Sequence, residues 1–259
     1  MSAIAETLSA AAPRSALRRL TITEAKLFVR ERYGIIWGVG FPLVLLIIFG
    51  NIPAFQQPSK DLGGLTYLDA YVPILIAFVV AILAVNAMPA ILAGYRERGV
   101  LRRMATTPVG PSRVLAAQLI VNLVLAVGTV ILILGVAWLA FGVGLPRQAA
   151  GFAVAAIFTL AALLALGLLV AAVAPSGRGA NAIGALLFFP MMFFAGLWLP
   201  RAAMPAVLRH VSDFTPLGAA VQALQDSAGG GWPHPLHLAV MAGYALVFGV
   251  AAARLFRWE

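Results

Sequence analysis

The sequence predicts an all-α integral membrane protein with six transmembrane helices, and composition is the first reason. Hydrophobic residues make up 62% of the 259 residues and charged residues 10%, with a mean hydropathy of +0.98. An average soluble domain carries about 25% charged residues. Uncharged, mostly apolar runs long enough to cross a bilayer, about 18 residues or more, recur along the chain. Short segments that hold most of the charge separate these runs.

The apolar runs define the expected helices in order. We expect spans at residues 34–50, 67–93, 114–141, 149–174, 180–199 and 236–253, all within one transmembrane domain of residues 34–259. The first is short and contains Pro42, and the second contains Pro73, Pro89 and the polar Asn86. The third carries two amides, Gln118 and Asn122, near one end. The fifth is dense in phenylalanine and methionine.

The distribution of positive charge fixes the expected orientation. Short loops rich in Lys and Arg are retained in the cytoplasm. With both chain ends inside, fourteen of the 18 Lys and Arg residues fall on the cytoplasmic side, five of them in the loop of residues 94–113. The four on the outside are Lys60, Arg147, Arg201 and Arg209. The protein is therefore expected in the plasma (inner) membrane with both termini cytoplasmic.

The segment before the first span is expected to lie along the membrane surface. Residues 14–32 hold six basic residues and two acids, Glu24 and Glu31. At helical spacing Leu17, Leu20, Leu27 and Phe28 share one face and the basic residues group on another, as in an interfacial helix. Residues 1–33 are thus assigned to a leader and an interfacial helix. The alternative is a solvated leader that only keeps positive charge inside.

Residues 200–226 are too long and too apolar for an ordinary outside loop. Met204, Val207, Leu208 and Val211 repeat at helical spacing, and so do Leu217, Ala220, Val221 and Leu224. Two prolines stand where such helices would begin, Pro205 and Pro216. We expect a pair of short helices that re-enters the membrane before the last span. The alternative is two helices lying on the outer surface.

The sequence lacks the residues that several classes of function require. Proton-driven transport needs ionisable groups inside the spans, and all nine acids lie in loops or at span ends. No G-K-[ST] phosphate loop occurs, and the chain has no Cys. His210, His234 and His237 lack ligand-like neighbours, so no metal site is expected, and loop position explains the basic charge without nucleic acid. The chain is expected not to be an enzyme; energy for transport would enter from another polypeptide.

Three stretches carry a family resemblance. RERGVLRRMATTPVGPSRVLAAQL (96–119) resembles the cytoplasmic loop of type-2 ATP-binding-cassette (ABC) permeases, in particular their bacterial daunorubicin and multidrug exporter branch. TEAKLFVRERYGIIWGVGFPLVLLIIFG (23–50) is similar to that family's interfacial helix and first span. FFAGLWLPRAAMPAVLRHVSDFTPLGAAVQAL (193–224) resembles its fifth-span exit and outside helices. Short outside loops make a large extracellular partner unexpected.

The resemblance implies roles for individual residues. Residues 14–32, with Glu24 and Glu31, would be the elbow helix, and residues 96–104 the coupling helix that seats on the ATPase subunit. Glu97 matches an acid whose partners in the family lie in the elbow helix and the ATPase. The implied contacts to the ATPase subunit are Arg96, Glu97, Arg98, Arg102 and Arg103; the implied pathway residues are Phe78, Asn86, Phe189 and Phe193, with Leu197 in an outer plug.

The expected function is that of the membrane subunit of an ATP-driven exporter of hydrophobic drugs or natural products, hence multidrug efflux and antibiotic resistance. Two separate ATP-binding subunits, which would hold ATP and Mg, and a second copy of the permease complete the implied assembly, and membrane lipid surrounds it. Two alternatives remain open. One is export of a lipid-linked glycan by the same kind of permease, and the other is a membrane scaffold or sensor that transports nothing. The basic arginines could also serve only to fix topology and bind anionic lipid.

Overall fold

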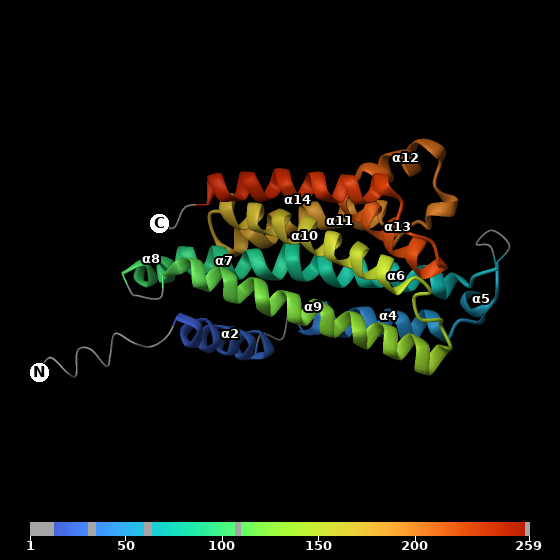
Figure 1. Cartoon of the computed structure of the whole chain (residues 1–259), viewed down its shortest axis with the longest axis horizontal. Coiled ribbons are helices and arrows are strands. Elements are labelled where there is room, and N and C mark those ends of the chain that lie inside the picture. The colour runs from blue at the N-terminus through green and yellow to red at the C-terminus, as the bar shows by residue number, and fades with distance from the viewer. Residues whose placement is uncertain (1–12, 31–34, 60–63, 107–109, 257–259) are drawn as a thin grey trace, which may run out of the picture.

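The computed structural model describes residues 13–30, 35–59, 64–106 and 110–256, and their regular structure is entirely helical (Figure 1). Most of the helices run along one common axis and form an elongated bundle. In chain order the elements are α2 (Pro13–Arg30), η1 (Ile36–Gly40), α4 (Phe41–Gly50), α5 (Pro53–Gln56), α6 (Tyr67–Ala81), η3 (Ile82–Ala87), α7 (Met88–Glu97), α8 (Val100–Ala105), α9 (Pro111–Phe141), α10 (Ala149–Val173), α11 (Gly177–Phe194), η4 (Arg201–Ala203), α12 (Ala206–Phe214), α13 (Pro216–Gly229) and α14 (Pro235–Leu255).

Five helical segments of the described chain are long and apolar enough to cross a membrane. They are Tyr67–Glu97, Ser112–Phe141, Ala149–Val173, Gly177–Phe194 and Pro235–Leu255. The prediction of an all-α membrane protein is therefore confirmed. The remaining expected span is the shorter apolar helix Ile36–Gly50, which would reach only about 22 Å at 1.5 Å per residue. A hydrocarbon core is about 30 Å thick, so the count of six spans stays a prediction.

The longest apolar segment is the centre of the bundle. Every residue from Val72 to Asn86, in α6 and η3, is buried. In its most apolar window 83% of the residues are buried, compared with 17% for α14 at the periphery. A helix that is apolar on all sides can be covered on all sides by protein, whereas a peripheral helix keeps an apolar face for lipid.

Two of the prolines in the apolar spans stand just after a widened turn. Pro42 follows η1 and Pro89 follows η3, both of them π-helical. Proline lacks the N–H that would bond to the carbonyl four residues earlier, so the turn before it rearranges. The Met88 N–H donates to the Leu83 carbonyl, five residues back. Pro73 lies inside α6 instead, which continues through it.

The fifth span is displaced from its predicted bounds of 180–199. Its helix, α11, begins at Gly177 and ends at Phe194. Gly196 adopts φ +89, the left-handed conformation that glycine accepts without strain, and the Leu197 N–H folds back to the Met192 carbonyl at 3.1 Å. Leu197 therefore lies beyond the helix. Its own carbonyl accepts a hydrogen bond from the Tyr71 hydroxyl at 2.7 Å, which fixes the end of α11 against α6.

The two short helices expected within residues 200–226 are present as α12 and α13, with Pro205 capping the first and Pro216 opening the second. The predicted apolar face of α13 is buried throughout: Leu217, Ala220, Val221 and Leu224. That of α12 is not, because Val207 and Val211 are exposed. The α13 helix packs among α6, α10 and α14 and so belongs to the bundle itself. Re-entry of the pair into a membrane stays a prediction.

Candidate functional site

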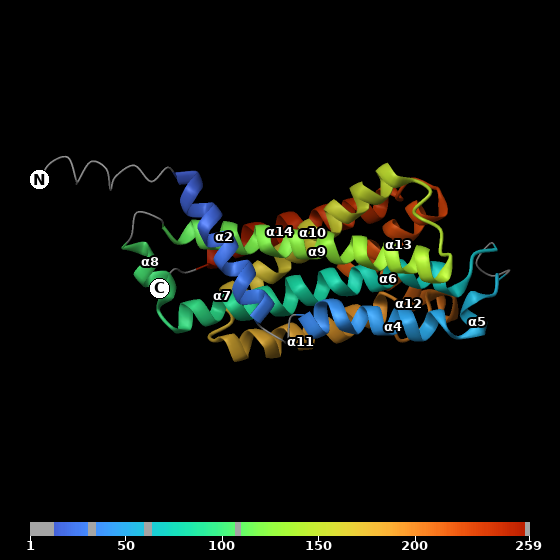
Figure 2. The ribbon, with the colours of Figure 1, turned by 90° about the horizontal axis from the view of Figure 1, so that it is seen from below.

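The two ends of the bundle differ in charge. Helices α2 and α8, the C-terminal end of α7 and that of α14 lie together at one end, while α5 and α12 lie at the other (Figures 1 and 2). Among the described side chains the first end, which we call the basic end, holds Arg18, Arg19, Lys26, Arg30, Arg96, Arg98, Arg102, Arg103, Arg113, Arg178 and Arg254; the opposite end holds Arg147, Arg201 and Arg209. The helices thus segregate charge as the predicted topology requires.

At the basic end, the last turn of α7 binds the turn between α10 and α11. Arg96 donates from Nη1 to the Ala172 carbonyl at 3.1 Å and from Nη2 to the Ala174 carbonyl. Glu97 accepts from the Gly177 backbone N–H at 3.1 Å. Cations stabilise helix C-termini and anions stabilise N-termini, so the two neighbouring charges match the two helix ends they contact. We call this set of contacts the clasp.

A buried carboxylate joins α2 to the helices on both sides of the basic loop of residues 94–113. Glu24 of α2 is only 7% exposed. Its Oε2 accepts from the Tyr95 hydroxyl of α7 at 2.8 Å and from Nε2 of Gln118 of α9 at 2.5 Å. Hydrogen bonds to a carboxylate are stronger than those between neutral groups, especially away from water. This Glu24 node therefore ties α2, α7 and α9 to one another.

The predicted coupling helix of residues 96–104 is interrupted. Gly99 adopts φ +66, which ends α7 and starts the six-residue helix α8. Leu101 is fully buried and anchors α8, whereas Arg102 and Arg103 are exposed. Arg98, in the turn, places its guanidinium 5.7 Å from the centre of the Tyr95 ring. The result is a short helix, fixed on its inner side, that presents two cations outward.

The predicted coupling residues make contacts within the described part of the chain. Glu97 was expected to pair with the elbow helix or the ATPase, which stays a prediction; among the described residues it contacts the N-terminus of α11. Of the two acids expected in the elbow helix, Glu24 bonds to Tyr95 and Gln118. Glu31 lies outside the described residues. Sequence reasoning assigned no role to Tyr95 or Gln118. An amide near the end of an apolar span was the one available signal for Gln118.

The predicted pathway residues do not meet in one cavity within the chain. Phe78 is buried, with its ring 5.3 Å from that of Phe188 and 5.4 Å from that of Phe41. Asn86 and Leu197 are also buried. Phe189 is 59% exposed on the outer face of α11, and Phe193 is half-buried beside Phe194. The five residues are divided between the packed interior and one exposed helix face.

Asn86 marks the closest packing between the central helix and α11. A Cβ atom added to Gly184 would lie 2.6 Å from the Val85 carbonyl oxygen and 2.7 Å from Asn86 Oδ1. Pro89 has no N–H to offer the Val85 carbonyl, so this oxygen is available to face α11. Within the part of the chain that the structure describes, the buried Nδ2 of Asn86 has no hydrogen-bond partner. In this conformation Asn86 therefore lies where the central helix crosses α11.

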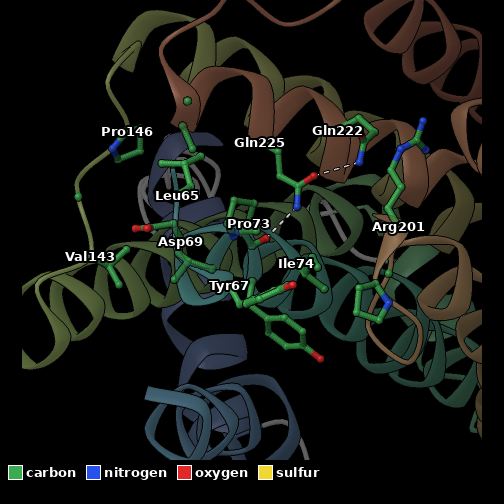
Figure 3. A pocket seen from close by; sticks show the side chains of 18 of the residues that line it. Leu65, Tyr67, Asp69, Pro73, Ile74, Val143, Pro146, Arg201, Gln222 and Gln225 are labelled. Carbon is green, nitrogen blue, oxygen red and sulfur yellow. Dashed lines mark hydrogen bonds between the residues drawn. The ribbon is translucent and has the colours of Figure 1, made fainter. Parts of the chain in front are cut away.

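The opposite end contains a cavity of about 760 Å³ (Figure 3). It lies between the first turns of α6 and helix α13, and the loops before α10 and after α11 complete its lining. Gln225 of α13 spans the two sides: its Nε2 donates to the Ala70 carbonyl at 2.8 Å, and its Oε1 accepts from Gln222 at 3.0 Å. Sequence reasoning gave no indication of this cavity, because its walls come from segments far apart in the chain.

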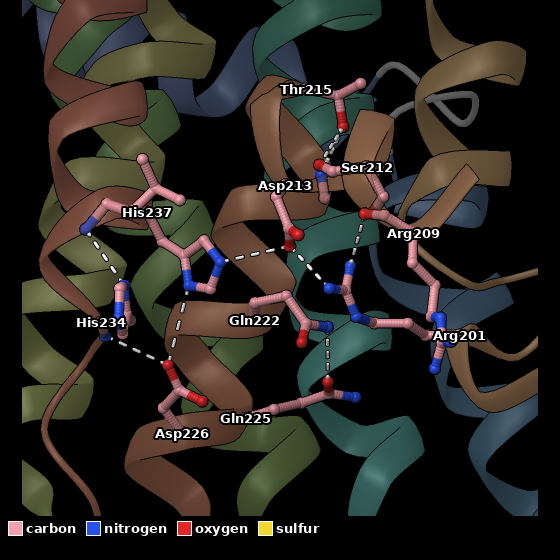
Figure 4. A network of polar contacts seen from close by, with 12 residues as sticks. Arg201, Arg209, Ser212, Asp213, Thr215, Gln222, Gln225, Asp226, His234 and His237 are labelled. Carbon is pink, nitrogen blue, oxygen red and sulfur yellow. Dashed lines mark hydrogen bonds and ion pairs between the residues drawn. The ribbon is translucent and has the colours of Figure 1, made fainter. Parts of the chain in front are cut away.

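A polar network holds α12, α13 and α14 together near the cavity (Figure 4). Asp213 accepts from Arg201 at 2.7 Å and lies 3.3 Å from Nε2 of the buried His237, whose Nδ1 is 3.7 Å from Asp226. Asp226 also accepts from the His234 backbone N–H at 3.1 Å. Burial raises the pKa of Asp226, but the imidazole of His237 and this N–H outweigh burial and lower it below 3.8.

The two histidines of this network contact groups on neighbouring helices. No group of three or more His, Asp or Glu side chains suited to a metal ion occurs in the described part of the chain. His237 instead connects two carboxylates on neighbouring helices, and His234 caps α14 with its side chain. The histidines at residues 234 and 237 therefore serve the packing of the helix pair against the last span.

Comparison with known proteins identifies the family. The family model described as ABC-2 type transporter matches residues 15–228, which include α2, the basic loop and the helix pair α12 and α13. A search of curated proteins returned no match. The matched region covers most of the chain and contains the clasp, the Glu24 node and all of the cavity lining except Gly229. The chain therefore belongs to the ABC-2 type transporter family, as a multi-pass permease component of the membrane.

Proposed function

We propose that the chain is the membrane subunit of an ATP-driven exporter and that a separate ATPase subunit, which binds ATP and Mg, docks at α8. The observation that carries this proposal is the clasp together with the Glu24 node. Tyr95 and Arg96 donate hydrogen bonds to α2 and to the end of α10, and Glu97 accepts one from the start of α11. Gln118 adds α9 through its bond to Glu24. A loop that only set the topology would need its charges but not these contacts.

In this proposal α8 receives the force and α7 distributes it. An ATPase surface bearing carboxylates would bind the exposed Arg102 and Arg103. The end of α7 would carry the displacement to the α10–α11 turn through the clasp and to α2 through the Glu24 node. Because α7 continues through η3 into the buried α6, the same displacement would reach the centre of the bundle. The widened turn η3 is the element along that route with the least regular hydrogen bonding.

We further propose a hydrophobic cargo and a second copy of the permease. The outer face of α11 exposes Leu186 and Phe189 at 74% and 59%. Soft and aromatic side chains suit an apolar site that accepts several ligands. Two copies that face each other through α11 would turn this face into the wall of a shared pathway. The proposed class of cargo, hydrophobic drugs or natural products, comes from the resemblance to the drug-exporter branch.

Coupling is tested with three variants of the permease, each purified with the ATPase that co-purifies with it. In Glu97→Gln we expect normal membrane insertion and cargo binding but a loss of ATP-driven export, because a neutral amide holds the N-terminus of α11 less strongly. The double variant Arg102→Ala/Arg103→Ala should release the ATPase. Arg254→Ala, an exposed arginine at the same end, is the matched control and should retain both properties.

Two results would count against the proposal. Full cargo-stimulated hydrolysis and export in Glu97→Gln would remove the clasp from the mechanism. An ATPase that stays bound to the Arg102→Ala/Arg103→Ala variant would leave α8 as a charge anchor, and absence of any co-purifying ATPase would favour the scaffold alternative.

The cargo site is tested by Phe189→Ala and Phe193→Ala. A buried phenylalanine costs about 3–5 kcal/mol when truncated, but Phe189 is mostly exposed and should cost far less. We expect an altered spectrum of transported compounds at normal abundance. Leu246→Ala, 69% exposed on α14, serves as the control on another apolar surface. An unchanged spectrum in both phenylalanine variants would assign the cluster to packing.

A further inference from the structure

We propose that the cavity at the opposite end is a binding site, within a single chain, for an amphiphile with an apolar tail and an anionic headgroup. The site needs neither the ATPase nor a second copy of the permease. It therefore goes beyond the proposed function and can be tested without transport.

The first argument is size and wall chemistry. The volume of about 760 Å³ lies in the range of roughly 300–1,000 Å³ that is usual for small-molecule sites. Aliphatic and aromatic side chains from four separate segments form much of the wall, among them Ile74, Leu134, Val143 and Phe152. An apolar tail would replace water against these groups, which favours binding.

The second argument is charge. Three arginines line the cavity, and Arg201 is already held by Asp213 at 2.7 Å. Arg147 and Arg209 are exposed, and among the residues that the structure describes neither guanidinium has an ion-pair partner. The single acid in the lining, Asp69, uses its Oδ2 to accept from the Thr66 N–H and hydroxyl at 2.8 and 2.7 Å. Two uncompensated guanidinium groups can therefore bind an anion.

The third argument is that several polar side chains of the lining already bond within the protein. Gln225 uses its Nε2 on Ala70 and its Oε1 on Gln222, and the Tyr71 hydroxyl donates to the Leu197 carbonyl. Figure 3 shows the two bonds of Gln225. Arg147 and Arg209 are exposed and have no ion-pair partner among the described residues, so they are more available to a headgroup, and the tail is directed to the apolar wall.

Protection of an engineered cysteine tests the site directly, because the native chain contains no Cys. Leu145→Cys lies in the cavity lining, and Val207→Cys is an exposed control on α12 outside it. The full chain is placed in phosphatidylcholine nanodiscs and labelled with a water-soluble maleimide. The probes share one tail: dodecyl phosphate, neutral dodecyl maltoside and cationic dodecyltrimethylammonium. A parallel set of nanodiscs contains phosphatidylglycerol and no added probe.

We expect dodecyl phosphate to slow labelling of Leu145→Cys in a saturable manner, with no effect on Val207→Cys. The double variant Arg147→Gln/Arg209→Gln should weaken this protection by about 10-fold or more, and Arg254→Gln, at the other end, should not. Protection by phosphatidylglycerol alone would assign the ligand to the bilayer, and protection only by the added phosphate would assign it to a soluble amphiphile. Equal protection by the neutral probe, protection that survives the double variant, or no protection by either anion would overturn the proposal.

Discussion

Replacing Gly167 by alanine is expected to destabilise the protein, although alanine is the better helix former. Gly167 lies in the middle of α10, where that helix crosses the central η3. A Cβ atom at this position would overlap the Ala84 carbonyl oxygen and would lie 2.9 Å from the carbonyl carbon. Real Cβ atoms essentially never approach within 3.0 Å, and the obstacle is buried backbone, which cannot rotate away. The two helices must therefore separate.

The size of the effect follows from a matched variant. Gly128 lies on α9, and an added Cβ would meet nothing within 4 Å. Both substitutions gain roughly 0.5–1 kcal/mol of helix preference, so their difference isolates the clash. Overpacking of this kind costs about 1–3 kcal/mol and occasionally more. At roughly 2–4 °C per kcal/mol for chains near this size, Gly167→Ala should melt several degrees below Gly128→Ala.

The assay uses the five native tryptophans, whose fluorescence reports unfolding of the purified protein in detergent. Gly128→Ala should melt at or slightly above the wild type, and Gly167→Ala below it. Equal melting temperatures for the two variants would refute the reasoning, because they would mean that α10 and η3 can separate without loss. A lower melting temperature for Gly128→Ala would point instead to an unrecognised contact on α9.

Three other predictions test the two ends of the bundle. Ser59→Cys should react with an impermeant maleimide from outside the cell and Ser112→Cys only after permeabilisation; the reverse pattern would invert the topology. Glu24→Gln should lower stability by roughly 1–3 kcal/mol in thermal unfolding, because a hydrogen bond to a carboxylate in a buried site is lost, and an unchanged stability would mean that the node is not formed. Because the folded-state pKa of Asp226 is lowered, its contact with His237 contributes fully above pH 3.8 and is lost below it. The stability difference between wild type and Asp226→Asn should therefore shrink as the pH falls below about 4; a difference that does not shrink there would contradict this.

Composition and periodicity alone determined the fold class, the approximate spans and the basic loop. These depend on properties of one continuous segment: an apolar stretch seeks lipid or a core, and arginines resist transfer across the bilayer. The apolar face of α13 was predictable for the same reason, since Leu217 and Leu224 recur at helical spacing and are buried. On the equally periodic face at α12, Val207 and Val211 are exposed, because periodicity shows which residues share a face and not whether a neighbour covers it.

The tertiary structure alone decided the partners. Glu24 meets Gln118 across 94 positions of sequence, and Glu97 meets the N-terminus of α11 across 80. The cavity likewise takes its arginines from three elements: Arg147 from the loop before α10, Arg201 from η4 and Arg209 from α12. Such contacts depend on how closely the helices approach, which glycines such as Gly167 set through backbone contacts between distant segments. No single window of sequence contains both sides of such a contact, and for that reason the charged residues could be located from sequence but their partners could not.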